Sequence, residues 1–224
     1  MQYASANAQS PFSEAGFRAL AATELSRNPP PLPSESGAAE SPSDFDLNPD
    51  LAADVLASRT PLLPAAVLIP VVARPALTVL LTQRTDSLQH HAGQVAFPGG
   101  KMEPGDADPI ATALREAEEE VGLDRRFVEP LGYLDAYRTG TGYRIFPVVG
   151  LVHDGFDLKL DPREVADAFE VPLAFLMDEQ NHRTHVLPWR GAERRFYAMP
   201  FEQRYIWGAT AGIMKNMHQR LFSA

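Results

Sequence analysis

The sequence predicts an α/β (α+β) fold in which a mixed β-sheet lies between helices. Apolar segments with strand character follow one another from Ala65 onward. Two helical patterns accompany them, one over residues 111–123 and one over residues 208–221. Strands combined with helices in this order favour a sheet whose faces are covered by the helices.

The strand signals occur in a clear order along the chain. They cover residues 65–72 (AAVLIPVV), 76–81 (ALTVLL), 93–97, 129–137 (EPLGYLDAY) and 143–152 (YRIFPVVGLV). Pro98, Gly99 and Gly100 are expected to interrupt the chain after the third of these. A mixed segment over residues 168–176 precedes a charged loop, and residues 195–199 predict a further strand.

Residues 1–60 differ in composition from the rest of the chain. Apolar residues in Pro11–Leu25 recur at helical spacing and predict one amphipathic helix. The stretch that follows is rich in proline, serine and acidic residues, which is typical of a linker or an extended arm. We expect an N-terminal helix and arm over residues 1–60 and a globular domain over residues 61–224. No catalytic pattern precedes Asp50, so removing the arm should leave the chemistry largely unchanged.

Composition narrows the class of protein. The chain has 224 residues, of which 45% are hydrophobic, enough for one well-buried domain. Its 20 Lys and Arg against 29 Asp and Glu give a net charge of −9, which disfavours a nucleic-acid surface. Cysteine is absent, which excludes thiolate metal sites and a cysteine nucleophile. Neither a membrane-spanning apolar run nor a signal peptide is evident, so we expect a cytoplasmic protein.

The helix predicted over Ala111–Leu123 has clear boundary signals. Asp108 suits the N-cap, Pro109 the first helical position, and Gly122 the end. Apolar residues form one stripe, as in a helix that is buried along one side. They are Ile110, Leu114, Ala117 and Val121.

The same helix carries an unusual density of negative charge. Because an α-helix turns about 100° per residue, Glu116, Glu119 and Glu120 share one face, whereas Glu118 points almost the opposite way. A pair between Arg115 and Glu119 is worth only a few tenths of a kcal/mol and does not offset this repulsion. Two interpretations remain open at this point: a solvated acidic face, or a site for Mg²⁺, which bridges carboxylates to substrate phosphates.

The residues before the helix favour the metal site, because a strand and a glycine-rich loop lead into it. The spacing of the glycine, arginine and glutamate residues resembles the Nudix box, the signature of a large family of pyrophosphohydrolases. The residues that carry the resemblance are Gly100, Arg115, Glu116, Glu119, Glu120 and Gly122. Asp106 replaces the first glutamate of that box and is separated from Arg115 by eight residues rather than seven. In this family such a residue mostly supports the loop and the helix start.

A second pattern resembles the coenzyme A pyrophosphatase branch of the family. It comprises Leu80, Leu81, Thr82, Arg84, Gly93, Phe97, Pro98, Gly99 and Gly100. Thr85 replaces the usual small residue, and Gln89 replaces an arginine. Similar segments continue to the C-terminal YIWGATAGI, so the resemblance covers most of the chain from Ala65 onward. It implies a Nudix hydrolase domain over residues 61–224, with a Nudix-like α/β/α sandwich and a catalytic helix.

The resemblance also implies a reaction: metal-dependent hydrolysis of the diphosphate bond of coenzyme A or acyl-coenzyme A. The products would be phosphopantetheine, or its acyl form, and adenosine 3′,5′-bisphosphate. The expected catalytic residues are Arg115, Glu116, Glu119 and Glu120, and the three glutamates would hold Mg²⁺ or Mn²⁺. Glu116 is the first choice as general base, with Glu164 as an alternative, and Arg115 would orient the glutamates.

We expect the substrate to be held by Arg84, Gly99 and Gly100, because the planar guanidinium of Arg84 suits a diphosphate. The expected partner is a small-molecule substrate, with no nucleic acid and no membrane, and a homodimer is left open. Two other functions also remain open. One is hydrolysis of ADP-ribose, dinucleotides or nucleoside triphosphates, and the other is nucleotide binding without turnover.

Other side chains fit structural roles better. His182 and His185 have a spacing seen in metal sites, but no third ligand is evident. Trp189 and Trp207 suit core anchors better than platforms for a base. The adjacent His90 and His91 suit a ligand contact and a plain loop role about equally.

Overall fold

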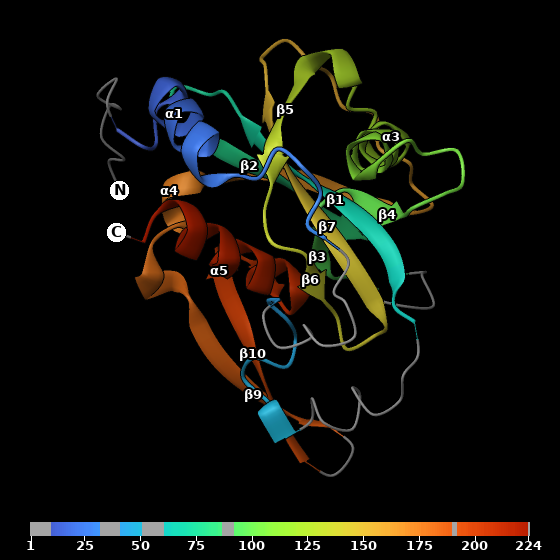
Figure 1. Ribbon diagram of the computed structural model, residues 1–224, viewed down its shortest axis with the longest axis vertical. Helices are drawn as coiled ribbons and strands as arrows, with labels where there is room; N and C mark the ends of the chain where they lie inside the picture. The colour runs from blue at the N-terminus through green and yellow to red at the C-terminus, as the bar shows by residue number, and fades with distance from the viewer. Residues whose placement is uncertain (1–9, 32–40, 51–60, 87–91, 190–191, 224) are drawn as a thin grey trace.

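The computed structural model describes residues 10–31, 41–50, 61–86, 92–189 and 192–223 (Figure 1). Its helices are α1 (Glu14–Glu24), α3 (Pro109–Val121), α4 (Leu173–Leu176) and α5 (Ala209–Leu221). The strands of its larger sheet are β1 (Leu63–Val72), β2 (Thr78–Arg84), β3 (Val95–Ala96), β4 (Gly99–Lys101), β5 (Val128–Tyr133), β6 (Tyr137–Arg138), β7 (Tyr143–Val152) and β8 (Val165–Pro172). A smaller sheet consists of β9 (Arg183–Trp189), β10 (Ala192–Phe201) and β11 (Arg204–Trp207). Two short 3₁₀ turns cover Arg125–Phe127 and Glu179–Asn181.

The larger sheet is mixed, as the sequence predicts. Strands β1 and β7 run parallel over their whole length, and the other pairings are antiparallel. Along one edge, β1 pairs with β2 only at Val71 and Val72, and with β4 only at Ala65–Val67. Strand β2 therefore diverges from β1, and the short strands β3 and β4 lie in the opening between them. This split brings Gly99 and Gly100 to the middle of the sheet.

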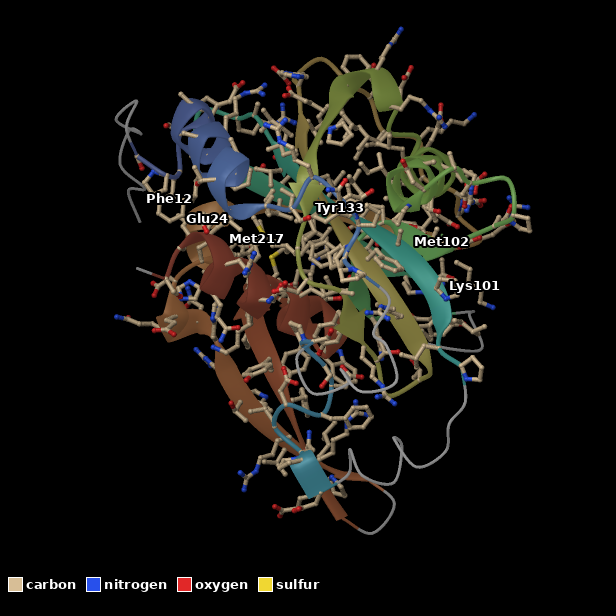
Figure 2. The ribbon with its side chains drawn as sticks, in the orientation of Figure 1. Phe12, Glu24, Lys101, Met102, Tyr133 and Met217 are labelled. Atoms are coloured by element: carbon tan, nitrogen blue, oxygen red, sulfur yellow. The ribbon has the colours of Figure 1, made fainter. Side chains whose placement is uncertain are left out.

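Helices cover both faces of the sheet (Figure 1). Successive residues of a strand point to opposite faces, so each strand contributes side chains to two separate cores. One face of β1 buries Ala66 and Leu68 with Ala113, Ala117 and Val121 of α3. The opposite face forms a second core with helices α1 and α5. Its fully buried members include Phe17, Ile69, Leu151, Ile213 and Met217, of which Met217 is labelled in Figure 2. The α/β/α sandwich predicted from the sequence is thus confirmed.

The N-terminal segment packs on the domain. Ser13 caps α1 by accepting a hydrogen bond from the Gly16 amide, and Phe12 stacks on Phe222 with ring centroids 5.3 Å apart (Figure 2). Residues 41–50 also contact the domain, since Asn48 hydrogen-bonds with the backbone of Arg195 in both directions. The predicted linker or extended arm spans residues 28–50. Of these, residues 32–40 lie outside the described residues, as do residues 51–60 beside the proposed domain boundary.

Two sequence expectations about strands were wrong. Gly99 and Gly100 do not only interrupt the chain: with Lys101 they form β4, because glycines without side chains can lie against β1 and α3. The charged segment after residue 176 contains β9, which pairs with β10 in a hairpin rather than forming a loop throughout. Strand β11 was not predicted either. In the described part of the chain, no helix has the length and apolar character that a membrane span requires.

Candidate active site

Helix α3 has the boundaries that the sequence predicts. The carboxylate of Asp108 accepts a hydrogen bond from the Ala111 amide at 2.8 Å, and Pro109 occupies the first turn. Gly122 ends the helix in the left-handed region with φ of 69°. There an added Cβ would lie 2.8 Å from the backbone nitrogen of Lys159, so glycine is needed for both its conformation and its size. The cap residues thus fix where the acidic face begins and ends.

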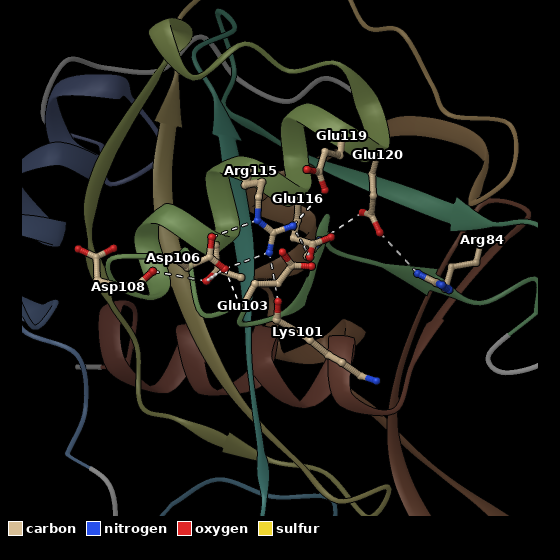
Figure 3. A network of polar contacts seen from close by, with 11 residues as sticks. Arg84, Lys101, Glu103, Asp106, Asp108, Arg115, Glu116, Glu119 and Glu120 are labelled. Atoms are coloured by element: carbon tan, nitrogen blue, oxygen red, sulfur yellow. Dashed lines mark hydrogen bonds and ion pairs between the residues drawn. The ribbon is translucent and has the colours of Figure 1, made fainter.

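Arg115 lies at the centre of the charge cluster (Figure 3). Its Nη1 atom donates to Glu116 Oε1 and to Glu119 Oε2, both at 3.0 Å. Its Nη2 atom donates to the carbonyl oxygen of Lys101 at 3.2 Å, which ties the helix to β4. The predicted contact between Arg115 and Glu119 is confirmed, and this arginine orients two glutamates through direct hydrogen bonds.

Asp106 completes the hold on Arg115. Its two carboxylate oxygens accept from Arg115 Nε at 3.1 Å and Nη2 at 3.0 Å. The same carboxylate accepts hydrogen bonds from the amide of Glu103 and the hydroxyl of Thr112. Because Arg115 donates to it, the pKa of Asp106 lies well below its usual value, and the backbone donor adds to this effect. An aspartate at this position therefore supports the loop and the helix start.

Glu116 is packed against the backbone of Gly100. A Cβ added to Gly100 would lie 2.5 Å from Glu116 Cδ and Oε1, far inside ordinary contact distance. Burial raises the pKa of the Glu116 carboxyl, and Arg115 counteracts this in part. The glycine of the loop thus makes room for one carboxylate rather than only bending the chain.

Glu120 is the most buried carboxylate of the cluster, with a side chain that is 4% exposed. Its Oε2 atom accepts from the Gly99 amide at 3.2 Å, and Oε1 lies 3.6 Å from Nη1 of Arg84 (Figure 3). Burial raises its pKa to about 7, even though the Gly99 amide and Arg84 both favour the charged form. The Nε atom of Arg84 is buried and has no hydrogen-bond partner among the described residues.

The remaining two glutamates of the helix lie in contrasting surroundings. Glu119 is 60% exposed and faces Arg115. Glu118 pairs with Arg125 through Oε2 at 2.9 Å, away from the other three carboxylates. The predicted opposition of Glu118 to the acidic face is confirmed.

A cavity of about 450 Å³ opens beside Glu120. Arg84, Gly99 and Gly100 line it, so all three predicted substrate-binding residues border one space, and Glu120 reaches this space only through its contacts with Arg84 and Gly99. The rest of its wall comes from the α5 face of the sheet, from α5 itself and from distant segments that contribute Asp44 and Arg194. The sequence motifs did not identify these two residues, because positions so far apart carry no local pattern.

The donor set fits a hard divalent cation. Glu116 and Glu120 offer desolvated carboxylate oxygens, and such oxygens are the ligands that Mg²⁺ prefers. In the described part of the chain, however, no three acidic, histidine or cysteine side chains converge closely enough to form a metal cluster. Glu119 contributes to this result because its carboxylate is turned toward Arg115. The assignment of all three glutamates as metal ligands therefore stays a prediction.

The structure also places three other residues that the sequence analysis considered, Glu164, His182 and His185. Glu164 is exposed on the loop before β8, yet its charge contributes to the raised pKa values of Glu116 and Glu120. His182 bonds the carbonyl of Leu176. His185 instead bonds the hydroxyl of Tyr205, so the two histidines have separate partners.

Trp207 differs from the expectation of a core anchor. Its side chain is half-buried, stacks edge-on against Phe196 at 5.2 Å and lines the cavity. It is the last residue of β11, next to Gly208 and Ala209, which line the same cavity. The other loop candidates, Gln89, His90 and His91, lie outside the described residues, as does the side chain of Trp189.

A family match and two similar proteins all indicate the same family. The NUDIX domain family matches residues 62–190. Over 157 residues, the chain is 44% identical to Uncharacterized Nudix hydrolase NudL of Photorhabdus laumondii, covering 70% of this chain and 84% of that protein. It is 43% identical to the NudL protein of Yersinia pestis, covering 70% of this chain and 79% of the relative.

Among solved structures, an Ap4A hydrolase from C. elegans in a binary complex is 20% identical, with a TM-score of 0.43, covering 49% of this chain and 80% of that one. The NUDIX domain of Shewanella oneidensis NrtR, complexed with ADP ribose, is 22% identical, with a TM-score of 0.40, covering 55% and 83%. On the sequence matches, this chain belongs to the Nudix hydrolase family, whose members act on nucleoside diphosphate derivatives and generally need divalent metal ions.

Proposed function

We propose that this protein hydrolyses the diphosphate bond of coenzyme A or acyl-coenzyme A. The products are phosphopantetheine, or its acyl form, and adenosine 3′,5′-bisphosphate. One observation carries the proposal. The buried carboxylate of Glu120 meets Arg84 and the Gly99 amide at the rim of a cavity large enough for a small-molecule substrate. The resemblance of residues 80–100 to the coenzyme A pyrophosphatase pattern supports this choice of substrate.

Each residue has a distinct role in the proposed reaction. Glu116, Glu119 and Glu120 would hold Mg²⁺ or Mn²⁺. A bound divalent ion neutralises charge on the phosphoryl oxygens and lowers the pKa of a water molecule. Arg84 donates hydrogen bonds to the diphosphate, and Arg115 fixes the orientation of Glu116.

Proton transfer requires a carboxylate close to the attacking water. Glu116 is our choice as general base, because its pKa is raised by burial and it lies against the loop that borders the cavity. Glu164 is the alternative, since it is exposed and its charge is felt by both buried glutamates.

Two other functions compete with this proposal. The first is hydrolysis of ADP-ribose or another nucleoside diphosphate derivative, which shares the diphosphate but not the pantetheine arm. The second is nucleotide binding without turnover. The second explains poorly why Glu120 stays buried with a pKa of about 7, because a binding module has no need of a desolvated carboxylate.

A substrate panel with Mg²⁺ and with Mn²⁺ tests the proposal. The panel contains coenzyme A, a long acyl-coenzyme A, ADP-ribose and a dinucleotide, and products are separated and quantified. We expect kcat/KM to be highest for one of the two coenzyme A forms. Turnover of ADP-ribose alone contradicts the substrate assignment, and binding without any turnover favours the non-catalytic function.

Variants on one helix test the carboxylate roles. Glu116→Gln and Glu120→Gln should each lower kcat by about 10²–10⁴-fold, the range of a positioned acid–base group. Glu118→Gln is the matched control, since this residue lies on the same helix but pairs with Arg125. Near-normal rates in Glu120→Gln would remove this residue from the catalytic site.

A further inference from the structure

The cavity beside Glu120 is not uniform in polarity: the end at Arg84 and Gly99, where the diphosphate would bind, differs from the far wall at Asp44, Thr139 and Thr141. We infer that it receives the uncharged pantetheine arm of the substrate, and that the adenosine 3′,5′-bisphosphate half lies outside it. This inference rests on the proposed function and adds the orientation of the substrate. It follows from the walls of the cavity, from its charges and from its neutral polar groups.

The walls between the sheet and α5 are largely apolar. Val67 of β1, Val95 of β3 and Ile145 of β7 line one side. Phe97 and Ile213 continue this surface and are almost fully buried. Such a lining favours a flexible, largely aliphatic arm, because the contact removes apolar surface from water on both sides.

The charges are arranged unevenly around the cavity. Arg84 lies 3.6 Å from Glu120, where the diphosphate would bind, whereas the ammonium of Lys101 lies over the ring of Tyr143 at 5.8 Å. At the far wall the charged residues are Asp44 and Arg194, which form an ion pair at 3.0 Å.

Asp44 is held firmly in place. Its side chain is only 11% exposed and accepts hydrogen bonds from the Tyr137 hydroxyl at 3.0 Å and the Gly140 amide at 2.8 Å, in addition to Arg194. Asp44 and Arg194 neutralise each other, and Arg194 is the more exposed of the two, at 27% of its side chain. The pair offers a 3′-phosphate no net positive charge, and its guanidinium is already bound to Asp44, so this wall suits an uncharged arm better than a bisphosphate.

Neutral polar groups at the wall match the amides of pantetheine. Thr139 and Thr141 line the cavity, and their hydroxyls lie 3.0 Å apart. A hydroxyl both donates and accepts, so these groups can pair with an amide without adding charge. Trp207 adds a half-buried aromatic surface beside them.

Several residues of the cavity lining lie outside the part of the chain that matches the family. The family match covers residues 62–190, whereas Asp44, Arg194 and Trp207 lie outside that range. The diphosphate end of the cavity is thus built from the region shared with the family, whereas the far wall combines Thr139 and Thr141 of that region with residues of the flanking segments. The arm that the sequence led us to regard as dispensable supplies part of this wall.

Fluorescence of Trp207 tests the inference without turnover. The chain has two tryptophans, so Trp189→Phe leaves Trp207 as the reporter. This variant is titrated with 4′-phosphopantetheine and with adenosine 3′,5′-bisphosphate, each with Mg²⁺. We expect a saturable change in Trp207 emission with phosphopantetheine and none with the bisphosphate. Trp207→Phe is the control and should abolish the signal.

The possible outcomes separate cleanly. A response to the bisphosphate alone reverses the orientation, and a response to neither ligand, or equally to both, also overturns the inference. If Trp189→Phe does not fold, quenching in the unmodified chain is compared with quenching in Trp207→Phe, and the same results decide. Failure of the unmodified chain to hydrolyse coenzyme A would overturn the proposed function instead, and that assay is independent of the fluorescence.

Discussion

Gly100→Ala introduces a single methyl group next to the candidate catalytic carboxylate. The new Cβ would lie 2.5 Å from Glu116 Cδ and Oε1, whereas ordinary contacts begin at 3.4 Å. The carboxylate must therefore move by about 1 Å, and a displacement of that size can cost about 10²-fold in rate. The cost in stability should be small, about 0.5–1.5 kcal/mol, because only the end of a flexible side chain has to leave its rotamer.

The assay compares kcat and thermal unfolding of Gly100→Ala with those of Gly105→Ala. Gly105 lies in the loop that follows β4, and a Cβ there meets no atom within 4 Å, so this variant controls for the change from glycine to alanine. We expect a large loss of kcat in Gly100→Ala only, with a melting temperature lowered by about 1–6 °C in Gly100→Ala and nearly unchanged in Gly105→Ala. Equal rates for the two variants would refute the placement of Glu116 at the reacting centre. If Gly100→Ala does not fold, the Glu116 side chain does not move aside at the small energetic cost proposed here.

Three further predictions follow from the contacts. Asp106→Asn should destabilise the protein at neutral pH by about 1–3 kcal/mol. Since Arg115 lowers the pKa of Asp106, this gap should shrink as the pH falls below the ordinary value of 3.8, and a gap that stays constant in thermal unfolding would contradict the pairing. Gly212→Ala places a methyl group against the Tyr137 hydroxyl and should cost about 1–3 kcal/mol of stability, so an unchanged melting temperature would argue against that packing. Because the pKa of Glu120 is raised to about 7, protons compete with the cation below that pH. The Mg²⁺ concentration for half-maximal rate should then rise about tenfold per pH unit, and a flat dependence would exclude Glu120 as a ligand.

Local signals in the sequence were sufficient for the catalytic helix and for the central strand. Asp108, Pro109 and Gly122 act within one turn of the helix ends, so residue type alone predicts the boundaries. Strand β7 spans Tyr143–Val152, as the strand pattern over residues 143–152 predicts. Both elements are determined mainly by the types of their own residues and of the residues next to them in the chain.

Features that depend on distant partners could not be predicted in this way. Strand β4 exists because Gly99 and Gly100 fit between β1 and α3, a fact about shape rather than propensity. The cavity wall joins Asp44 to Arg194, which is 150 positions further along the chain. No periodicity or motif relates such residues, and only folding brings them together.

The contacts of Arg115 change the reasoning about why so many carboxylates are tolerated on one helix. Crowding alone argues for a cation, but Arg115 already donates to Glu116 and Glu119 and so relieves part of the repulsion within the protein. Glu120 is different, because its nearest cation, Arg84, lies at 3.6 Å and burial still raises its pKa to about 7. Desolvation of this one carboxylate, rather than the number of acidic residues, is therefore the stronger physical indication of a divalent ion at the site.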